Sequence, residues 1–184
     1  MNLHKILDSN YIIESKNKKF NSPNELLYYM KQNFEYGWIL NGKKMNTDSK
    51  KMNTEYYVMQ PKQFEQYKVG TCHEQALYAY TKLIDMGFKC KLISIHQFYT
   101  SQHLFVIFKQ NNKWFHLENA FQKYQGIHGP YNKIKTIIYD VHKQMIEGKD
   151  YGYSYKIIDP KKLLKLDINM YKYLTIVGFN FKKV

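Results

Sequence analysis

Hydrophobic residues recur at helical spacing in two stretches of the first half of the chain. The first stretch, 22–35, opens with Ser22 and Pro23, a pair typical of the start of a helix. The second stretch covers 72–86 and is followed by Gly87, the residue type favoured just beyond a helix end. Both stretches are therefore predicted to be amphipathic helices. The expected buried positions of the second helix are Ala76, Leu77, Tyr80, Leu83 and Ile84.

Alternation of apolar and polar residues after the second helix predicts strands. Residues 88–98 follow this alternation, with Cys90 as an inward-facing structural residue. Residues 103–118 are predicted to form a β-hairpin that turns at Asn111 and its neighbour Asn112. The apolar run at 173–181 predicts further strand near the end of the chain.

The order of these elements predicts an α+β fold in which the helix over 72–86 packs on an antiparallel sheet. A third helix is expected over 132–147, with Asn132 as its cap. The stretch 41–56 is rich in Lys and Asn and is predicted to be a flexible surface loop or flap. The whole chain, 1–184, is interpreted as one domain.

Composition narrows the class of protein. Of the 184 residues, 44% are hydrophobic, which is enough for a folded core. No stretch approaches the roughly 20 consecutive apolar residues of a membrane-spanning helix. The first residues are charged and lack an apolar leader segment, and two cysteines cannot form a disulfide framework. We therefore expect a cytoplasmic protein without a membrane span.

The net charge is strongly positive, at +13, and all 28 basic residues are Lys. Arg is the preferred residue for bidentate contacts with phosphate and guanine, so its absence argues against a dedicated nucleic-acid-binding protein. A charge of this size still attracts anionic partners at low salt. Weak, nonspecific binding to anionic surfaces or nucleic acid is therefore expected.

The candidate nucleophile is Cys72, at the mouth of the second predicted helix and directly after Gly70 and Thr71. Unsatisfied backbone N–H groups and the positive end of the helix dipole favour a thiolate at this position. A thiolate nucleophile needs a base, and the base needs an orienting group. His103 begins one strand of the predicted hairpin and Glu118 ends the other, so antiparallel pairing can bring them together.

This ordered set resembles the transglutaminase-like superfamily. The resemblance rests on Gly-x-Cys-x-Glu-x-Ala at 70–76, on His103, and on Trp114-x-x-x-Glu118, and it covers about 60–120, the predicted core. It implies the papain-related α+β fold that transglutaminases share with microbial cysteine proteases and peptide N-glycanases. It also implies roles for the residues: Cys72 as nucleophile, His103 as general base and acid, and Glu118 as the orienting carboxylate.

The chain departs from the family pattern at its last position. The family usually has Asp followed by Pro, whereas this chain has Glu118 followed by Asn119. The extra methylene moves the carboxylate by roughly one C–C bond, more than about 1 Å, which matters for a hydrogen bond. Asn119 is therefore a second candidate for orienting His103, as an amide does in papain-like enzymes. Gln66 is the candidate side-chain donor to an oxyanion, beside the backbone N–H of Cys72.

The predicted function is thiol-dependent acyl transfer on amide bonds of a protein or peptide substrate, through a thioester on Cys72. A cysteine protease or amidase is favoured, because the resemblance includes no acidic cluster for calcium. Two alternatives stay open: a transglutaminase that cross-links proteins, and a catalytically inactive basic binding module on the same fold. No cofactor is expected.

Other histidines compete for the role of base. His96 lies on the preceding predicted strand and is the best substitute. His73 neighbours the nucleophile but is expected on another face of the helix, and His116 should share a strand face with Glu118. A metal site built from Cys72 and these histidines lacks zinc-like ligand spacing, so no metal is expected.

Overall fold

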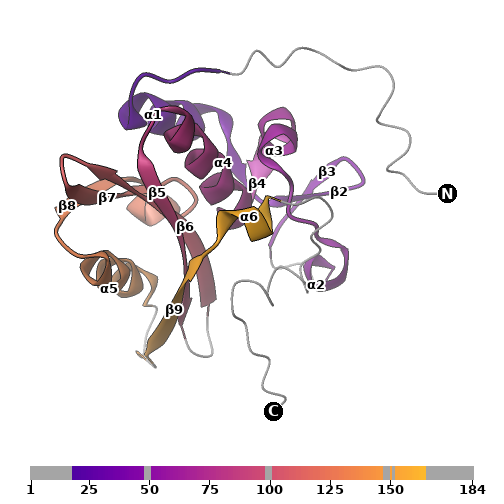
Figure 1. Cartoon of the computed structure of the whole chain (residues 1–184). Coiled ribbons are helices and arrows are strands. Elements are labelled where there is room, and N and C mark those ends of the chain that lie inside the picture. Colours follow the sequence, from indigo (N-terminus) through magenta and orange to yellow (C-terminus); the bar gives the residue numbers. More distant parts are fainter. Residues whose placement is uncertain (1–17, 48–50, 98–100, 147–149, 151, 165–184) are drawn as a thin grey trace.

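A five-stranded antiparallel sheet forms the centre of the molecule (Figure 1). The computed structural model describes residues 18–47, 51–97, 101–146, 150 and 152–164. The strands of the sheet are β5 (Lys89–Gln97), β6 (Ser101–Gln110), β7 (Lys113–Glu118), β8 (Gly126–Tyr131) and β9 (Tyr153–Ile158). Their order across the sheet is β8-β7-β6-β5-β9. Together with the helices around the sheet, this confirms the predicted α+β class.

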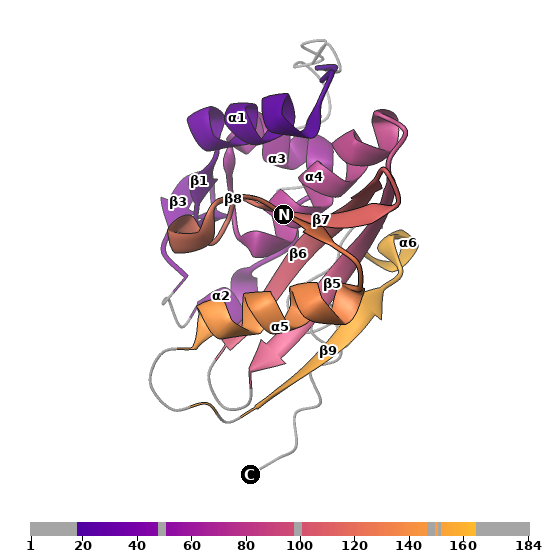
Figure 2. The same ribbon diagram turned by 90° about the vertical axis from the view of Figure 1, so that its left-hand side faces the viewer.

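Helices cover both faces of the sheet (Figures 1 and 2). The helix α4 (Cys72–Asp85) packs on β5 and β6 and is joined on that side by α1 (Pro23–Asn33) and α3 (Pro61–Tyr67). The helix α5 (Ile134–Met145) covers the other face, as Figure 2 shows. Shorter helical elements are α2 (Met52–Glu55), α6 (Pro160–Leu163) and a 3-10 turn at Gln122–Tyr124. Among the described residues, no helix has the length and apolar character required to cross a membrane.

Strand β6 contributes to two apolar cores because its side chains alternate between the faces of the sheet. Leu104, Val106 and Phe108 pack with α4, α1 and α3, whereas Phe105 and Ile107 pack with α5. All five of these side chains are buried. A strand covered on both faces explains why this part of the sequence is a continuous apolar run instead of an alternating one.

The two helix predictions in the first half of the chain are confirmed. Helix α1 begins after Ser22, whose side chain accepts the backbone N–H of Glu25 at 3.2 Å. Helix α4 matches its predicted start and lies one residue short of its predicted end. The prediction for Ile84 is wrong, since this side chain is 43% exposed and Lys82 is buried instead. Lys82 can lie inside because its ammonium is 3.8 Å from the carboxylate of Glu65.

The predicted hairpin is present, with both turn residues at positive φ: Asn111 at 48° and Asn112 at 61°. This is the conformation that favours Asn in a two-residue turn between twisted strands. The predicted cap of the third helix is wrong. Helix α5 begins later, at Ile134, and Asn132 instead accepts a hydrogen bond from the Lys113 ammonium.

Two strands of the sheet were not predicted, and one predicted strand cannot be compared. Strand β8 follows the hairpin and pairs with β7, and β9 forms the sheet edge beside β5. The strand predicted at 173–181 lies outside the described residues. The assignment of 1–184 to one domain stays a prediction.

The polar segment after α1 contains short regular elements. Strand β1 (Glu35–Tyr36) pairs in parallel with β4 (Val69–Gly70), and β2 (Trp38–Leu40) pairs with β3 (Lys43–Met45) as a small hairpin. The described part of the predicted flap therefore contains β3 and α2. Its role as a flap stays a prediction.

Candidate active site

Cys72 is the first residue of α4, and only 4% of its surface is exposed. The preceding residue caps the helix: the Thr71 side chain accepts the backbone N–H of His73 at 3.2 Å, and Glu74 accepts the backbone N–H of Thr71 at 2.8 Å. This capping box fixes the first turn and therefore the position of the sulfur. The helix dipole places positive potential at the same point.

A close approach of three elements explains the glycine before the cap. A Cβ at Gly70 would come within 2.6 Å of the Phe64 ring and 2.7 Å of the Glu74 Cβ, so no larger residue fits there. Gly70 also pairs with Tyr36 across β1 and β4, and the backbone N–H of Gly37 donates to the Gly70 carbonyl at 3.3 Å. The end of β1 is therefore held beside the start of α4.

His103 and Glu118 form a buried pair, as their places on the hairpin predict. His103 Nε2 lies 2.6 Å from Glu118 Oε2, and both side chains are less than 10% exposed. The other carboxylate oxygen accepts the backbone N–H of Phe121 at 2.9 Å. The imidazole of His103 also contacts the Cys72 sulfur, and this contact raises the pKa of the ring. Since Nε2 faces the carboxylate, Nδ1 is the nitrogen that remains for the sulfur.

The pKa shifts at these three residues favour an ion pair. Burial alone would raise the pKa of the Cys72 thiol, but the charge of His73 and a hydrogen bond from His103 outweigh burial and lower it well below its usual value. Burial would lower the pKa of His103, but the Glu118 charge and the contact with Cys72 raise it to about 10. Burial would raise the pKa of Glu118, but the charge of His103 lowers it. Thiolate, imidazolium and carboxylate are therefore the favoured forms near neutral pH.

His73 corrects an expectation from the sequence. Its imidazole was expected on another face of the helix, but it lies close to the Cys72 sulfur, and its charge lowers the pKa of that thiol. On its other side, His73 Nδ1 lies 3.0 Å from the Thr71 hydroxyl. The side chain is 6% exposed. The sulfur is therefore in contact with two imidazoles, one from α4 and one from β6.

Tyr36 is a site residue that the sequence analysis missed. Its hydroxyl lies near the Cys72 sulfur, and the negative charge on that sulfur is the main reason why the pKa of Tyr36 is raised. Tyr36 is 41% exposed, so it lies between the buried sulfur and the solvent. A two-residue strand carries no periodicity in the sequence, and only its pairing with β4 brings it to the site.

Of the two supporting residues proposed from the sequence, Asn119 lines the cavity beside Cys72, whereas Gln66 does not. Asn119 donates from Nδ2 to Gln75 Oε1 at 2.7 Å, and Gln75 in turn donates to the Gly70 carbonyl at 3.1 Å. Asn119 thus braces β7 against the start of α4, and the imidazole of His103 is paired with Glu118 instead. Gln66 lies in α3 with an exposed side chain. The described contacts of the sulfur are with Tyr36, His73 and His103, so the oxyanion role of Gln66 has no support here.

The remaining histidines occupy different environments. His116 is fully buried, and its Nε2 lies 3.2 Å from Glu118 Oε2, on the shared strand face that the sequence predicts. Burial lowers the pKa of His116, which favours its neutral form beside the charged pair. His128 stacks on Tyr124, with ring centroids 3.7 Å apart. His96 contacts Ser94 at 3.3 Å on β5.

The space around the sulfur is small. A cavity of about 10 Å³ lies beside Cys72, between α4 and the sheet, which is room for about one water molecule. In the part of the chain that the structure describes, no three His, Cys, Asp or Glu side chains are grouped so that they could hold a metal ion.

No protein-family model matches the chain, and no curated protein matches it significantly. The resemblance stated above therefore rests on the residues of this chain alone.

Proposed function

We propose that this protein catalyses thiol-dependent acyl transfer on amide bonds through Cys72, His103 and Glu118. The observation that supports the proposal is the position of the His103 ring, which contacts the Cys72 sulfur with one side and lies 2.6 Å from Glu118 Oε2 with its Nε2. A nucleophile, a base and an orienting carboxylate in this order form a triad by role and geometry.

The first half of the reaction forms a thioester. The Cys72 thiolate attacks the carbonyl carbon of the substrate, and the carbonyl oxygen becomes an oxyanion. The backbone N–H of Cys72 and the hydroxyl of Tyr36 are the proposed donors to that oxyanion. His103 in its imidazolium form then gives its Nδ1 proton to the leaving nitrogen, the C–N bond breaks, and an amine departs.

The second half returns the enzyme to its starting state. Neutral His103 takes a proton from the incoming water or amine, which attacks the thioester carbon and displaces the Cys72 sulfur. Water yields a carboxylic acid, and an amine yields a new amide. Glu118 holds the ring in one orientation throughout, because its second oxygen is fixed by the backbone N–H of Phe121.

Hydrolysis is the favoured outcome, which would make the protein a cysteine protease or amidase acting on a protein or peptide. The residues that resemble the transglutaminase-like superfamily include no acidic calcium cluster, and the chain has only 15 acidic residues. A papain-like core and a cytoplasmic location are part of the same proposal. Transfer to a Lys amine, which cross-links proteins, is the alternative outcome of the same chemistry.

The direct test is incubation of the full chain with unfolded casein and with glutamine-containing peptides, with and without a primary amine. Mass spectrometry separates cleavage, deamidation and amine incorporation. We expect cleavage or deamidation by the unaltered protein and by Cys90→Ser, and none by Cys72→Ala. Equal turnover by the Cys72→Ala variant would contradict the proposal.

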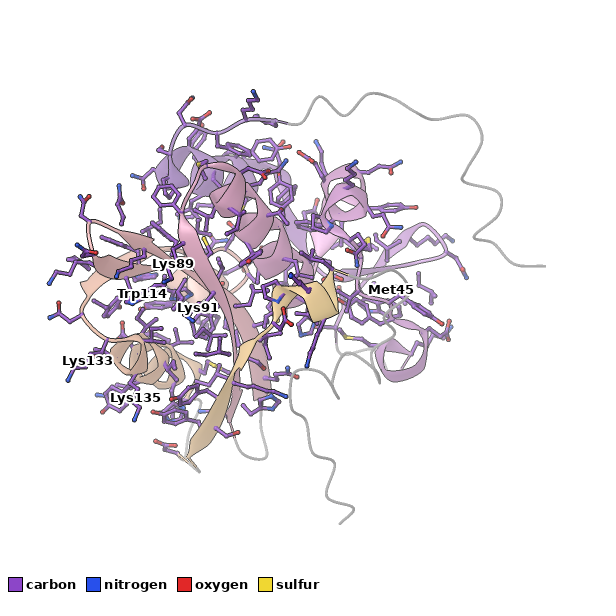
Figure 3. All side chains as sticks on the ribbon, viewed as in Figure 1. Met45, Lys89, Lys91, Trp114, Lys133 and Lys135 are labelled. Carbon is purple, nitrogen blue, oxygen red and sulfur yellow. The ribbon has the colours of Figure 1, made fainter. Side chains whose placement is uncertain are left out.

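A basic binding module is the second candidate, and one surface favours it. Lys89 lies opposite Lys109, and Lys109 lies opposite Trp114, in neighbouring strands. Figure 3 shows Lys89, Lys91 and Trp114 on the side of the molecule that also carries Lys133 and Lys135, away from Met45. Lysines around an aromatic ring suit an anionic partner. Retention on heparin that falls steeply with salt, without any thiol reactivity at Cys72, would favour this candidate.

A further inference from the structure

A second hydrogen-bonded chain leads from a buried carboxylate to the Cys72 sulfur. It begins at Glu74, continues through the Thr71 hydroxyl at 2.8 Å, and reaches His73 Nδ1 at 3.0 Å. The imidazole of His73 contacts the sulfur. The pair His103 and Glu118 reaches the same sulfur from the sheet. Two imidazoles, each tied to its own carboxylate, therefore lie against one sulfur.

The proton positions in this second chain follow from its acceptors. Four donors converge on the Glu74 carboxylate: the backbone N–H groups of Met59 and Thr71, and the hydroxyls of Thr71 and Tyr56. Burial raises the pKa of Glu74, and the hydroxyl bonds and the charge of His73 oppose that shift. When this carboxylate is ionised it only accepts, so both hydroxyls donate to it. The Thr71 oxygen must then accept from His73, which places a proton on Nδ1 of His73.

His73 lies directly after Cys72 in the same helix, so its contact with the sulfur is held by the helix itself. His73 is the second residue of α4, its backbone N–H is bonded to the Thr71 hydroxyl, and its side chain is 6% exposed. His103 lies on a different element, near the start of β6. The first imidazole therefore moves with the sulfur, whereas the second is positioned across the interface between helix and sheet.

We propose that His73 is a second imidazole partner that holds the Cys72 thiolate, which leaves His103 to move the protons of acyl transfer. This inference rests on the proposed function. When His103 gives its proton to the leaving group, the positive charge of that ring is lost. A second imidazolium in contact with the sulfur keeps positive charge beside it at that stage and in the free enzyme. His73 exchanges no proton with the substrate in this scheme.

The polar and charged neighbours of the sulfur come from four elements, and some favour the thiolate whereas others oppose it. His73 from α4 and His103 from β6 favour the thiolate, and Tyr36 from β1 donates to it. Glu74 from α4 and Glu118 from β7 carry negative charge and oppose it, but each is paired with its own imidazole chain. Removal of one imidazole should therefore raise the pKa of the thiol without restoring its ordinary value.

The test measures thiolate formation and needs no substrate. In a Cys90→Ser background, the rate of iodoacetamide labelling of Cys72 is followed from about pH 5 to about pH 10, together with the ultraviolet absorbance of the thiolate, which does not depend on reagent access. The variants are His73→Gln, His73→Asn, His103→Gln and the double variant His73→Gln/His103→Gln. His142→Gln is the matched control, because His142 is also a buried helical histidine but lies in α5. Circular dichroism and thermal unfolding establish that each variant is folded.

We expect both His73 variants to lose at least about tenfold in labelling rate near pH 6, with the midpoint of thiolate absorbance moved up by about one pH unit or more. His103→Gln should keep a thiolate at that pH, and the double variant should lose it. Unchanged profiles in both folded His73 variants, or complete loss of the low-pH thiolate in His103→Gln alone, would overturn the inference. If the unaltered Cys72 shows no low-pH thiolate, the proposed function itself fails. If it shows one that does not depend on His73, only this inference fails.

Discussion

The two cysteines of this chain have opposite environments. Cys72 begins a helix, contacts two imidazoles and a tyrosine hydroxyl, and has a pKa well below the usual value. Cys90 lies on β5 next to the aromatic side chains of the core, and burial raises the pKa of its thiol to about 12. Cys72 is the more deeply buried of the two, so burial by itself does not decide which thiol ionises.

The comparison shows that the partners of a buried thiol outweigh its desolvation. Both sulfurs are removed from water, which favours the neutral thiol in each case. Only Cys72 has positive groups close enough to reverse that preference, and they come from the helix start and from the neighbouring sheet. Cys90 donates weakly to the Phe88 carbonyl at 3.5 Å, a contact that favours the protonated form. Substitutions at these partners should therefore change the difference in pKa between the two thiols.

The largest effect is expected from removal of the reactive sulfur. Cys72→Ala should abolish turnover, because no other thiol in the described residues contacts an imidazole pair. Cys90→Ala should leave turnover within about twofold and lower thermal stability slightly, since it removes a partly buried side chain. Mass-spectrometric assay of both purified variants on the same peptide substrate decides the matter, and a loss of equal size in both would contradict the comparison.

The second largest effect is expected at the pair on the hairpin. His103→Gln should reduce kcat by about 10²- to 10⁴-fold, because it removes the proton donor and acceptor. Glu118→Asp should also reduce kcat, since the carboxylate would withdraw from His103 Nε2 by roughly one C–C bond. Steady-state kinetics check both. A Glu118→Asp variant as active as the unaltered protein would show that the length of this side chain does not matter.

A third prediction concerns stability and its pH dependence. Glu118→Gln should lower the free energy of unfolding by about 3–5 kcal/mol, because it leaves the buried imidazolium without its carboxylate. The pKa of Glu118 is lowered in the fold, so its contribution is present above about pH 4.3 and is lost as pH falls. The pKa of His103 is raised to about 10, so its contribution is complete below about pH 6.5 and is lost as pH rises through about 10.

Denaturant unfolding at a series of pH values checks the predicted pH dependence of this stability. The difference in free energy of unfolding between the unaltered protein and Glu118→Gln should be largest between about pH 4.3 and 6.5. It should become smaller at lower and at higher pH. A difference that does not vary with pH would mean that the pair contributes packing and not charge.

A smaller effect is expected from the hydroxyl of Tyr36. Tyr36→Phe removes one donor to the thiolate and to the proposed oxyanion while it keeps the ring, so kcat should fall by about 10²-fold at unchanged KM. The thiol pKa of Cys72 should rise modestly in the same variant, because the two imidazoles remain. A fall in KM with unchanged kcat would instead identify Tyr36 as a group that only blocks access to the sulfur.

The smallest effect is expected from distant surface charge. Lys89→Gln with Lys109→Gln removes two positive charges that lie opposite each other on β5 and β6. Salt screens such exposed charges over about 10 Å, so the labelling profile of Cys72 should not move while retention on heparin falls. A raised thiol pKa in this variant would mean that the general charge of the chain, and not the local imidazoles, ionises Cys72.

Local signals in the sequence predicted the elements that carry the proposed triad. The capping residues before α1 and α4 and the paired Asn residues of the hairpin turn act within a few positions of each other, so their effect is readable without the rest of the fold. The partnership of His103 with Glu118 followed from the two ends of that hairpin.

Contacts between elements that are distant along the chain could not be predicted in this way. Tyr36 reaches the sulfur only because β1 pairs with β4, two strands of two residues each. The contact between His73 and the sulfur depends on the rotamer that the Thr71 hydroxyl selects, which helical periodicity does not encode. Strand β8 was missed because its Gly and Pro residues are typical of loops, although at Gly126 a Cβ would lie a close 3.1 Å from the His128 ring.

The most direct measurement is the pH dependence of alkylation at the two cysteines of the unaltered protein, resolved by peptide mass spectrometry. With limiting iodoacetamide at about pH 6, Cys72 should be modified while Cys90 stays intact, and Cys90 should react only well above about pH 8.5. Parallel, slow labelling of both residues across the whole range would contradict the assignment of Cys72 as a stabilised thiolate.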